Sequence, residues 1–416
     1  MTRTLDVYLH QHLIGQLIQD EHGEMMFDYA ESWRKNPAAI PLSNSLPLRK
    51  ERFTRNECRG FFAGVLPEES QREIIAKNLG ISARNDFAML EQIGGECAGA
   101  VTFIRADQTF PPRNDRYRPL TGHELADILK QLPRRPLLAG EDGIRLSLAG
   151  AQDKIAVHVS HENISIPLGG APSTHILKPA MERFAGTVFN EALCMKLAQA
   201  IGLQAATVEI GRVEDVDYLL VERYDRKTTP PSIQRLHQED FCQALGIVSE
   251  NKYQNEGGPS LQQCFALLRE LSSAPVIDLQ RLLDAVIFNF LVGNHDAHGK
   301  NFSLIYQEGT LSSGPDKRLA PLYDVLNTGY YPELAKKMAM KIGGEYVSDQ
   351  ILPKHFEQLA QEAGLARPMV KRRVPELAET ILAKLSDITI GHPVAIAVAR
   401  LIQSHCERTI GKFKNS

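Results

Sequence analysis

Apolar and polar residues alternate near the start of the chain. In Leu5-Asp6-Val7-Tyr8-Leu9 every second residue is aliphatic, and further apolar runs follow before residue 30. Polar breaks fall at Gln11-His12 and His22-Gly23. Period-two alternation with such breaks is typical of antiparallel strands joined by short turns, so residues 4–30 are predicted to form a β-meander. The remainder of this first region is predicted to contain two helices and a strand, around 60–78, 84–94 and 100–104.

Residues 105–119 are polar and proline-rich, as in a linker. Thr121 and Glu124 then have capping-box spacing, which predicts a helix to about Leu132. Two runs further on are predicted to pair as a hairpin, residues 145–148 and 154–159. We expect three more elements after it: a strand over 174–179, a helix over 187–201 and a strand over 218–222.

The pattern becomes mainly helical from about residue 238. Apolar residues recur at steps of three and four between Leu279 and Leu291, which gives one wide apolar helix face directly before a polar segment. Three more helices are predicted at 349–363, 368–386 and 392–412. The pattern indicates an α+β protein with four segments: a β-rich N-terminal subdomain (1–104), a linker and helix (105–140), a second β-containing core (141–237) and a helical lobe (238–416).

Composition narrows the class of protein. A chain of 416 residues that is 43% hydrophobic is expected to form two or three domains. Its six cysteines are scattered without a C-x-x-C pair, which fits a reducing cytosol. The N-terminus has no apolar signal region, and no run approaches the roughly 18 apolar residues that span a bilayer, so we expect a soluble, unexported protein without membrane contact. A net charge of −3 argues against a general nucleic-acid binder.

The polar segment after the helix carries the candidate chemistry. It reads Asn294-His295-Asp296-Ala297-His298-Gly299-Lys300-Asn301-Phe302. Asp296 and Asn301 have the same offset as the base and the magnesium ligand of the protein-kinase loop H-R-D-x-x-x-x-N. Asp324 would be the second magnesium ligand, since Mg²⁺ takes few protein carboxylates beside phosphate oxygens and water. Upstream, Lys178 on its strand and Glu191 on the next helix would supply a phosphate-binding lysine and its ion-pair partner.

Each of these residues also has a structural interpretation. The segment 295–298 fits a helix C-terminal cap with histidines that complement the dipole. His-Asp-x-His also resembles the ligands of a mononuclear metal hydrolase. Lys178 alone fits a solvated surface lysine, Glu191 a first-turn glutamate and Asp324 a turn residue. The order Lys178, Glu191, Asp296, Asn301, Asp324 favours the phosphotransferase.

Over nearly its full length the chain resembles the HipA-type serine/threonine kinase toxins of bacterial toxin–antitoxin modules. The strings Ser147-Leu148-Ala149-Gly150-Ala151-Gln152-Asp153-Lys154 and Asp296-Ala297-His298-Gly299-Lys300-Asn301-Phe302-Ser303 are jointly specific for that family. The other matching segments are Pro41–Leu48, Ile93-Gly94, Cys97–Thr102, Thr174–Lys178, Asn190-Glu191, Val221–Arg226, Gly257-Gly258-Pro259 and Tyr323-Asp324.

The resemblance implies a two-lobed protein-kinase-like fold related to the phosphatidylinositol-kinase branch, with ATP and Mg²⁺ as cofactors. Asp296 would be the catalytic base, supported by His298 and Lys300, and Asn301 and Asp324 would bind magnesium. ATP would contact the loop Ala149, Gly150, Ala151, Gln152, Asp153 and Lys154, then Lys178, His298, Asn301, Tyr323 and Asp324, and a hinge of Glu222, Arg223 and Tyr224. Ser147 corresponds to the serine that the family autophosphorylates to switch itself off.

Two features depart from protein kinases. Val325-Leu326 replaces the Phe-Gly that follows the metal aspartate of the DFG motif, and no G-x-G-x-x-G lid is present. The loop Leu148–Lys154 holds one glycine, so its phosphate contacts must be few or come from backbone N–H groups.

The resemblance also implies partners. They are a helix-turn-helix antitoxin, operator DNA through the antitoxin complex, and an aminoacyl-tRNA synthetase as the phosphorylated protein. Lys371-Arg372-Arg373 is either a DNA contact or a solvated helix face. Three hypotheses follow: an active kinase toxin, a catalytically silent corepressor, and a kinase of a small molecule or lipid.

Overall fold

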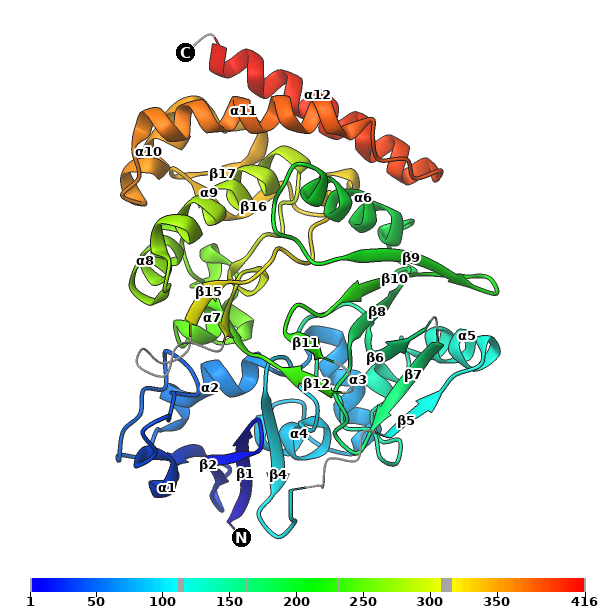
Figure 1. Ribbon diagram of the computed structural model, residues 1–416, viewed down its shortest axis with the longest axis vertical. Helices are drawn as coiled ribbons and strands as arrows, with labels where there is room; N and C mark the ends of the chain where they lie inside the picture. Colours follow the sequence, from blue (N-terminus) through cyan, green and yellow to red (C-terminus); the bar gives the residue numbers. More distant parts are fainter. Residues whose placement is uncertain (1, 111–115, 162, 230–231, 308–315, 415–416) are drawn as a thin grey trace. The chain divides into compact units, whose positions relative to one another are not determined.

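The computed structural model describes residues 2–110, 116–161, 163–229, 232–307 and 316–414. The chain forms two compact units. Unit 1 comprises Met1–Pro179, Gly211–Glu250 and Ile305–Asp316, and unit 2 comprises Ala180–Ile210, Asn251–Leu304 and Lys317–Ser416. The predicted α+β class is confirmed, with strands concentrated in the N-terminal region and helices in the C-terminal part (Figure 1). The finer division into four segments stays a proposal.

Unit 1 begins with the predicted meander, closed by a fourth strand. The antiparallel order is β3-β2-β1-β4. Leu5, Val7 and Leu9 are buried, as their alternation predicts. Phe62 of α2 packs against Phe27 of β3, with ring centroids 5.3 Å apart, so helices cover the apolar face of this sheet. The elements are β1 Arg3–Leu9, β2 His12–Gln19, β3 Met25–Tyr29, α1 Glu31–Arg34, α2 Arg55–Gly64, α3 Glu69–Leu79, α4 Asp86–Ile93 and β4 Val101–Arg105.

A six-stranded sheet follows in the order β5-β7-β6-β8-β10-β9. Its strands are β5 Arg116–Pro119, β6 Ile155–Ser160, β7 Asn163–Leu168, β8 His175–Pro179, β9 Val208–Val213 and β10 Val216–Glu222. The predicted helix after Thr121 is present as α5 Gly122–Gln131, and Thr121 and Glu124 form the capping box. A short 3₁₀ helix, η1 Pro136–Leu138, precedes the segment that leads to β6.

One prediction in this region is wrong. Residues 145–148 are not a strand paired with 154–159; Leu146 instead forms an isolated parallel bridge with Glu96, and β6 pairs with β7 and β8. Pairing with a residue distant in sequence overrode the local pattern there.

The segment 105–119, which we interpret as a linker, includes the last residue of β4 and the whole of β5, and its residues 111–115 lie outside the described residues. Its role as a domain boundary stays a proposal.

Shorter strands follow β10 along the chain. The elements are β11 Arg226–Thr229 and β12 Ser232–Arg235, which pair with each other, then β13 His237–Asp240, β14 Ser303–Gln307 and β15 Asp316–Leu319 in the order β13-β14-β15, with α7 Phe241–Ala244 and η2 Ser249–Asn251.

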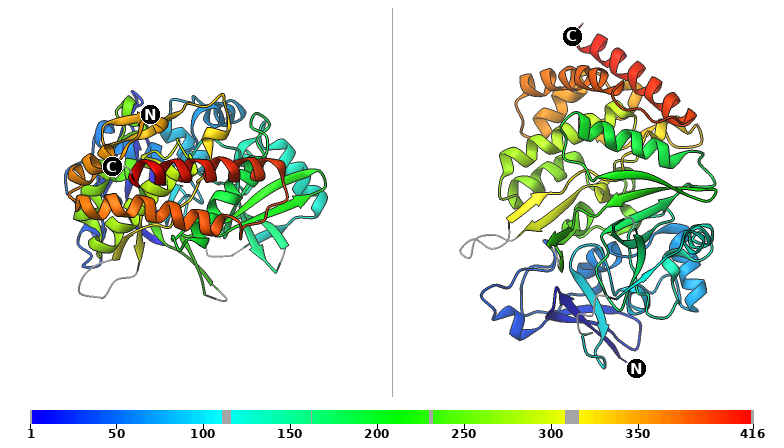
Figure 2. Two further views of the ribbon diagram at one scale, coloured as in Figure 1. Left: turned by 90° about the horizontal axis from the view of Figure 1, so that it is seen from above. Right: turned by 45° about the vertical axis from the view of Figure 1, so that its right-hand side comes forward.

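Unit 2 is mainly helical. Figure 2 shows α11 and α12 side by side, and both contact α6 and α9. The helix predicted before the polar segment is the buried α9, and the three predicted C-terminal helices are present. No described helix combines the length and apolar character needed to cross a lipid bilayer. The elements are α6 Thr187–Ala200, η3 Gln254–Glu256, α8 Leu261–Leu271, α9 Pro275–Val292, η4 Gly299–Asn301, η5 Thr328–Tyr330, β16 Lys337–Ile342, β17 Glu345–Val347, η6 Ser348–Gln350, α10 Pro353–Glu362, α11 Arg367–Leu385 and α12 Pro393–Lys414.

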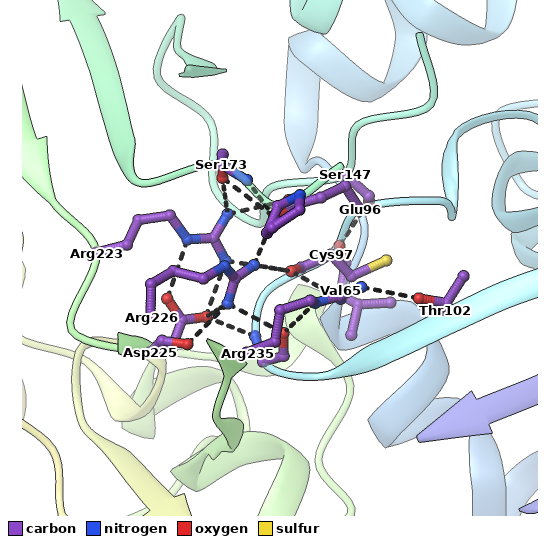
Figure 3. Close-up of polar contacts among 12 residues, drawn as sticks. Val65, Glu96, Cys97, Thr102, Ser147, Ser173, Arg223, Asp225, Arg226 and Arg235 are labelled. Atoms are coloured by element: carbon purple, nitrogen blue, oxygen red, sulfur yellow. Dashed lines mark hydrogen bonds and ion pairs between the residues drawn. The ribbon is translucent and has the colours of Figure 1, made fainter. Parts of the chain in front are cut away.

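A buried ionic network ties the N-terminal region of unit 1 to the end of β10 (Figure 3). Glu96 accepts hydrogen bonds from Arg223 at 3.1 Å and from Arg226 at 2.6 Å. Asp225 accepts from Arg223 at 2.8 and 2.9 Å and from the backbone N–H of Gly99 at 2.7 Å. The four charged side chains are all buried. Buried charges need such pairing because they have lost their hydration.

The network keeps its charges at neutral pH. Burial raises the pKa of Glu96, but Arg223, Arg226 and Arg235 outweigh burial and lower that pKa to about 2. Burial, with Arg226 close by, lowers the pKa of the Arg235 guanidinium to about 10. Three guanidiniums thus face two carboxylates. The backbone carbonyl of Cys97 helps to balance them, because it accepts from Arg223, Arg226 and Arg235 at 3.1, 3.1 and 3.4 Å.

We expect Glu96→Gln to lower the free energy of unfolding by about 3–5 kcal/mol, because losing one partner of a buried ion pair leaves the others desolvated and unpaired. Urea titration measures this. The exposed Glu31 pairs with Lys35 at 2.7 Å on one helix turn; Glu31→Gln is the control and should change stability by less than about 0.5 kcal/mol. Equal, small effects of both substitutions would contradict the prediction.

The same substitution tests a pH dependence. The folded-state pKa of Glu96 lies below its unfolded value of about 4.3, so its stabilisation is fully present above that pH and is lost as the pH falls toward about 2. Glu96→Gln should therefore flatten the acid side of the stability curve, and an unchanged slope would show that Glu96 is not responsible for it.

Candidate functional site

The polar segment 294–302 is built on the end of α9 in unit 2. Gly293 caps the helix with φ 75°, and its N–H bonds to the carbonyls of Asn289 and Phe290. Gly293 therefore caps the helix, and the interpretation of residues 295–298 as a helix C-terminal cap with histidines is not needed. Buried amides then support the segment: Asn294 donates to Asn289 Oδ1 at 2.7 Å and accepts from the N–H of Asp296 at 3.2 Å.

Asp296 is an exposed carboxylate between the half-buried His295 and the buried Ala297. Tyr253 donates its hydroxyl to Asp296 Oδ1 at 2.7 Å. The N–H of His298 donates to the backbone carbonyl of Asp296 at 2.8 Å, and the Tyr253 and His298 rings meet edge to face with centroids 5.3 Å apart. The carboxylate is thus presented to solvent on a fixed backbone, as a general base requires.

Asn301 and Asp324 come together as the sequence predicts for two metal ligands. Asn301 Nδ2 donates to Asp324 Oδ2 at 3.2 Å, and Asn301 Oδ1 is buried without a hydrogen-bond donor among the described residues. Asp324 has φ 59°, a left-handed conformation that is uncommon for non-glycine residues but is tolerated by aspartate better than by most. An amide oxygen without a donor beside a carboxylate fits a hard cation such as Mg²⁺.

The hydrolase alternative requires a different ligand set. Among the described side chains, no three or more of His, Cys, Asp and Glu are placed to hold a metal ion. The histidines at 295 and 298 therefore do not belong to a cluster of that kind.

Asn190 fixes the chain after Asp324, a role that our sequence reasoning missed. Its side chain donates to the carbonyl of Asn327 at 2.9 Å and accepts from the N–H of the same residue at 2.8 Å. Asn190 is fully buried in α6, next to Glu191. A lone asparagine inside an apolar helix was the available signal, because buried amides need partners.

Two further predicted residues support the loop. Tyr323 donates its hydroxyl to the carbonyl of Lys300 at 2.6 Å and shares a hydrogen bond with Ser303 Oγ at 2.7 Å. Lys300 and Glu191 are both buried. Lys178 is buried at the end of β8 in unit 1. The predicted Lys178–Glu191 ion pair joins residues of different units and stays a prediction.

The predicted phosphate loop, residues 149–154, is half-buried in unit 1. Lys154 Nζ bonds to the carbonyl of Ala149, and Asp153 accepts from Gln71 at 2.6 Å. Gly150 has φ 107°, and a Cβ there would lie 2.5 Å from Lys154 Nζ, so only glycine suits this turn. Ala151 and Gln152 complete the loop.

Ser147 is fully buried. Its hydroxyl donates to the carbonyl of Val65 at 2.7 Å, and its N–H bonds to the carbonyl of Glu96 at 2.9 Å (Figure 3). In this conformation the hydroxyl is closed to any phosphate donor.

The three predicted hinge residues differ in their exposure and in the partners of their side chains. Glu222 is exposed, and Tyr224 is half-buried with its hydroxyl bonded to Gln238. The guanidinium of Arg223 forms ion pairs with Glu96 and Asp225. The predicted nucleotide contact of Arg223 is therefore limited to its backbone.

The basic cluster 371–373 is paired within unit 2. Arg373 binds Asp284 at 2.7 and 3.0 Å. Lys371 pairs with Glu357 at 3.5 Å and Arg372 with Glu376 at 3.1 Å. These ion pairs fit the solvated helix face better than the DNA contact.

Comparison with known proteins gives consistent similarities. The HipA-like C-terminal domain family matches residues 146–385, and the HipA N-terminal domain family matches residues 5–104. Y4mE of Sinorhizobium fredii, which carries a kinase name, is 47% identical over 91% of this chain and 90% of its own length. The serine/threonine-protein kinase toxin HipA of Shewanella oneidensis is 28% identical over 99% of this chain and 96% of its own.

A solved structure is similar over the same length. The Shewanella oneidensis HipA in complex with HipB and its operator DNA matches with a TM-score of 0.86 and 27% identity, covering 99% of both chains.

We expect Asn190→Ala to lower the free energy of unfolding by about 1–3 kcal/mol, because both backbone groups of Asn327 would lose their partner while buried. Urea unfolding measures the change. Asn163 is exposed and makes one 3.4 Å bond to the carbonyl of His161. Asn163→Ala is therefore the matched control, and a comparable loss in that variant would contradict a specific role for Asn190.

Proposed function

This chain belongs to the HipA family of serine/threonine protein kinase toxins, and from that premise we propose that it phosphorylates an aminoacyl-tRNA synthetase and its own Ser147. As a kinase it uses ATP. The observation that carries the proposal is in unit 2, where the exposed carboxylate of Asp296 lies on the same loop as Asn301, and the amide of Asn301 meets Asp324. A silent corepressor has no chemical need for that arrangement.

Asp296 is proposed to orient the substrate hydroxyl and to accept its proton while the hydroxyl oxygen bonds to the γ-phosphorus of ATP and ADP leaves. Asn301 and Asp324 would hold Mg²⁺, which neutralises charge on the phosphate oxygens when bound. Tyr323 holds the backbone of Lys300, and His298 holds that of Asp296, so these residues keep the loop in shape.

The unit 1 residues are proposed to bind the nucleotide. Lys178 and the loop 149–154 would contact the phosphates, with the loop contributing backbone N–H groups as well as Lys154. Glu222, the backbone of Arg223 and Tyr224 would line the adenine side.

Autophosphorylation of Ser147 would act as an off switch. Because the hydroxyl is buried against Val65, the segment has to leave its place before it can be phosphorylated. A phosphate carries a charge of about −1.5 to −2 at neutral pH and could not return to that buried position. The loop 149–154 follows directly, so its displacement would remove phosphate contacts.

The partners are proposed from the relatives. Shewanella oneidensis HipA is found with HipB and operator DNA. We propose that this chain likewise binds a helix-turn-helix antitoxin and meets operator DNA through it. The ion pairs of Lys371, Arg372 and Arg373 leave that cluster without an assigned part in DNA binding.

Asp296→Asn should lower kcat by about 10²-fold or more, because the transition state loses its proton acceptor. The assay uses labelled ATP with Mg²⁺ and a panel of aminoacyl-tRNA synthetases, and ATP affinity should remain unchanged. Asp387→Asn, on an exposed residue paired with Lys384, serves as the control. Wild-type kcat in Asp296→Asn would contradict the assignment of the base. No transfer to any synthetase by active enzyme would contradict the substrate class.

Ser147→Ala should abolish self-labelling while activity toward the protein substrate persists for longer, because the off switch is absent. Phosphopeptide mapping locates the label and a time course measures the activity. Limited proteolysis of the labelled wild type should cut near residues 146–154, which resist cleavage before labelling. Self-labelling that survives in Ser147→Ala would refute the switch.

A further inference from the structure

The segment Gly257-Gly258-Pro259 matches the family but has no part in the proposed chemistry. Its glycines close a turn around η3. The carbonyl of Tyr253 accepts the N–H groups of Glu256 at 2.9 Å and of Gly258 at 2.8 Å. Gly257 has φ 99°, and a Cβ on Gly258 would lie 2.5 Å from the carbonyl oxygen of Asn251. Both positions therefore require glycine.

The turn is attached to the rest of unit 2. Gln254 Oε1 accepts the N–H of Lys341 on β16 at 2.8 Å. On its other side, α8 starts at once with a capping box between Ser260 and Gln263. The backbone of Tyr253 is thus fixed from both ends of the turn, and its side chain emerges from a rigid base.

That side chain reaches the catalytic segment. The Tyr253 hydroxyl donates to Asp296 Oδ1 at 2.7 Å, and its ring meets the ring of His298 edge to face at an interplanar angle of 79°. His298 in turn holds the backbone carbonyl of Asp296 through its N–H at 2.8 Å. Side chain and backbone of Asp296 are therefore restrained by two residues that also contact each other.

We propose that Tyr253 is a positioning residue for phosphoryl transfer, which orients the Asp296 carboxylate by binding Oδ1 and so directs its other oxygen toward the substrate hydroxyl. The proposal rests on the role of Asp296 as the base. Misorientation of a reacting group lowers the rate without weakening nucleotide binding. The glycine-rich turn is then the support that keeps Tyr253 in place.

Tyr253→Phe tests this, because it keeps the ring against His298 and removes only the hydroxyl. We expect kcat to fall about 10-fold, the effect of losing one hydrogen bond of about 1.4 kcal/mol to a charged group, while KM for ATP and the melting temperature stay at wild-type values. Tyr346→Phe is the matched control, since Tyr346 lies in the same unit and its hydroxyl forms no hydrogen bond with another described residue. The control should leave kcat unchanged.

The double variant Tyr253→Phe/Asp296→Asn separates positioning from other roles. If Tyr253 acts through Asp296, the double variant should have the kcat of Asp296→Asn alone. A further 10-fold fall, a wild-type kcat in Tyr253→Phe, or a kcat loss accompanied by a lower melting temperature would each overturn the proposal. Full activity in Asp296→Asn would instead overturn the assignment of the base, whatever Tyr253 does.

Discussion

The buried ionic network of Glu96, Arg223, Asp225 and Arg226 is the constraint on which unit 1 depends. It joins the end of the N-terminal region to the chain that leaves β10, two segments more than a hundred residues apart. Isolated, each of these charges would be costly to bury, whereas the two carboxylates and two guanidiniums together are neutral. The nearby guanidinium of Arg235 adds one positive charge, and the backbone carbonyls of Cys97, Gly99 and Val101 accept hydrogen bonds from it. The network explains why residues 1–104 and the strands proposed to bind nucleotide form one compact unit.

Ser147 lies at the edge of this network through its backbone bond to Glu96. The segment proposed to be the off switch is thus hydrogen-bonded to the backbone of a carboxylate residue that is itself paired with two arginines. Its displacement would remove one backbone partner from Glu96 and leave the ion pairs with Arg223 and Arg226 in place. The proposed switch is therefore compatible with a stable core, because the loop can leave while the charges stay paired.

In unit 2, buried asparagine side chains supply hydrogen bonds to polar groups around the catalytic segment. Asn190, Asn289 and Asn294 are buried and satisfy the irregular chain around the catalytic segment, since an amide both donates and accepts. Asn301 differs, because its Oδ1 has no donor among the described residues. The contrast between satisfied structural amides and this one oxygen is what marks the proposed metal site.

The sequence was sufficient to predict elements and residues where local signals agree with the fold. The meander, the capping box at Thr121, α9 and the C-terminal helices were predicted from periodicity and end signals. The motif also indicated Asn301 and Asp324, whose side chains do meet in unit 2. The sequence failed where partners are distant: residues 145–148 pair with Glu96 and not with their neighbours, and Arg223 is engaged by Glu96. The contact of Tyr253 with Asp296 had no local signal either, since it depends on a turn closing near another loop.

Native-state hydrogen exchange tests most directly whether the network makes unit 1 a single cooperative structure. The amide of Gly99, which donates to Asp225, should exchange with the same opening free energy as amides within β1 and β8. Exchange of Gly99 through an opening several kcal/mol lower, with β8 still protected, would contradict this, because the N-terminal region could then separate without disturbing the strands.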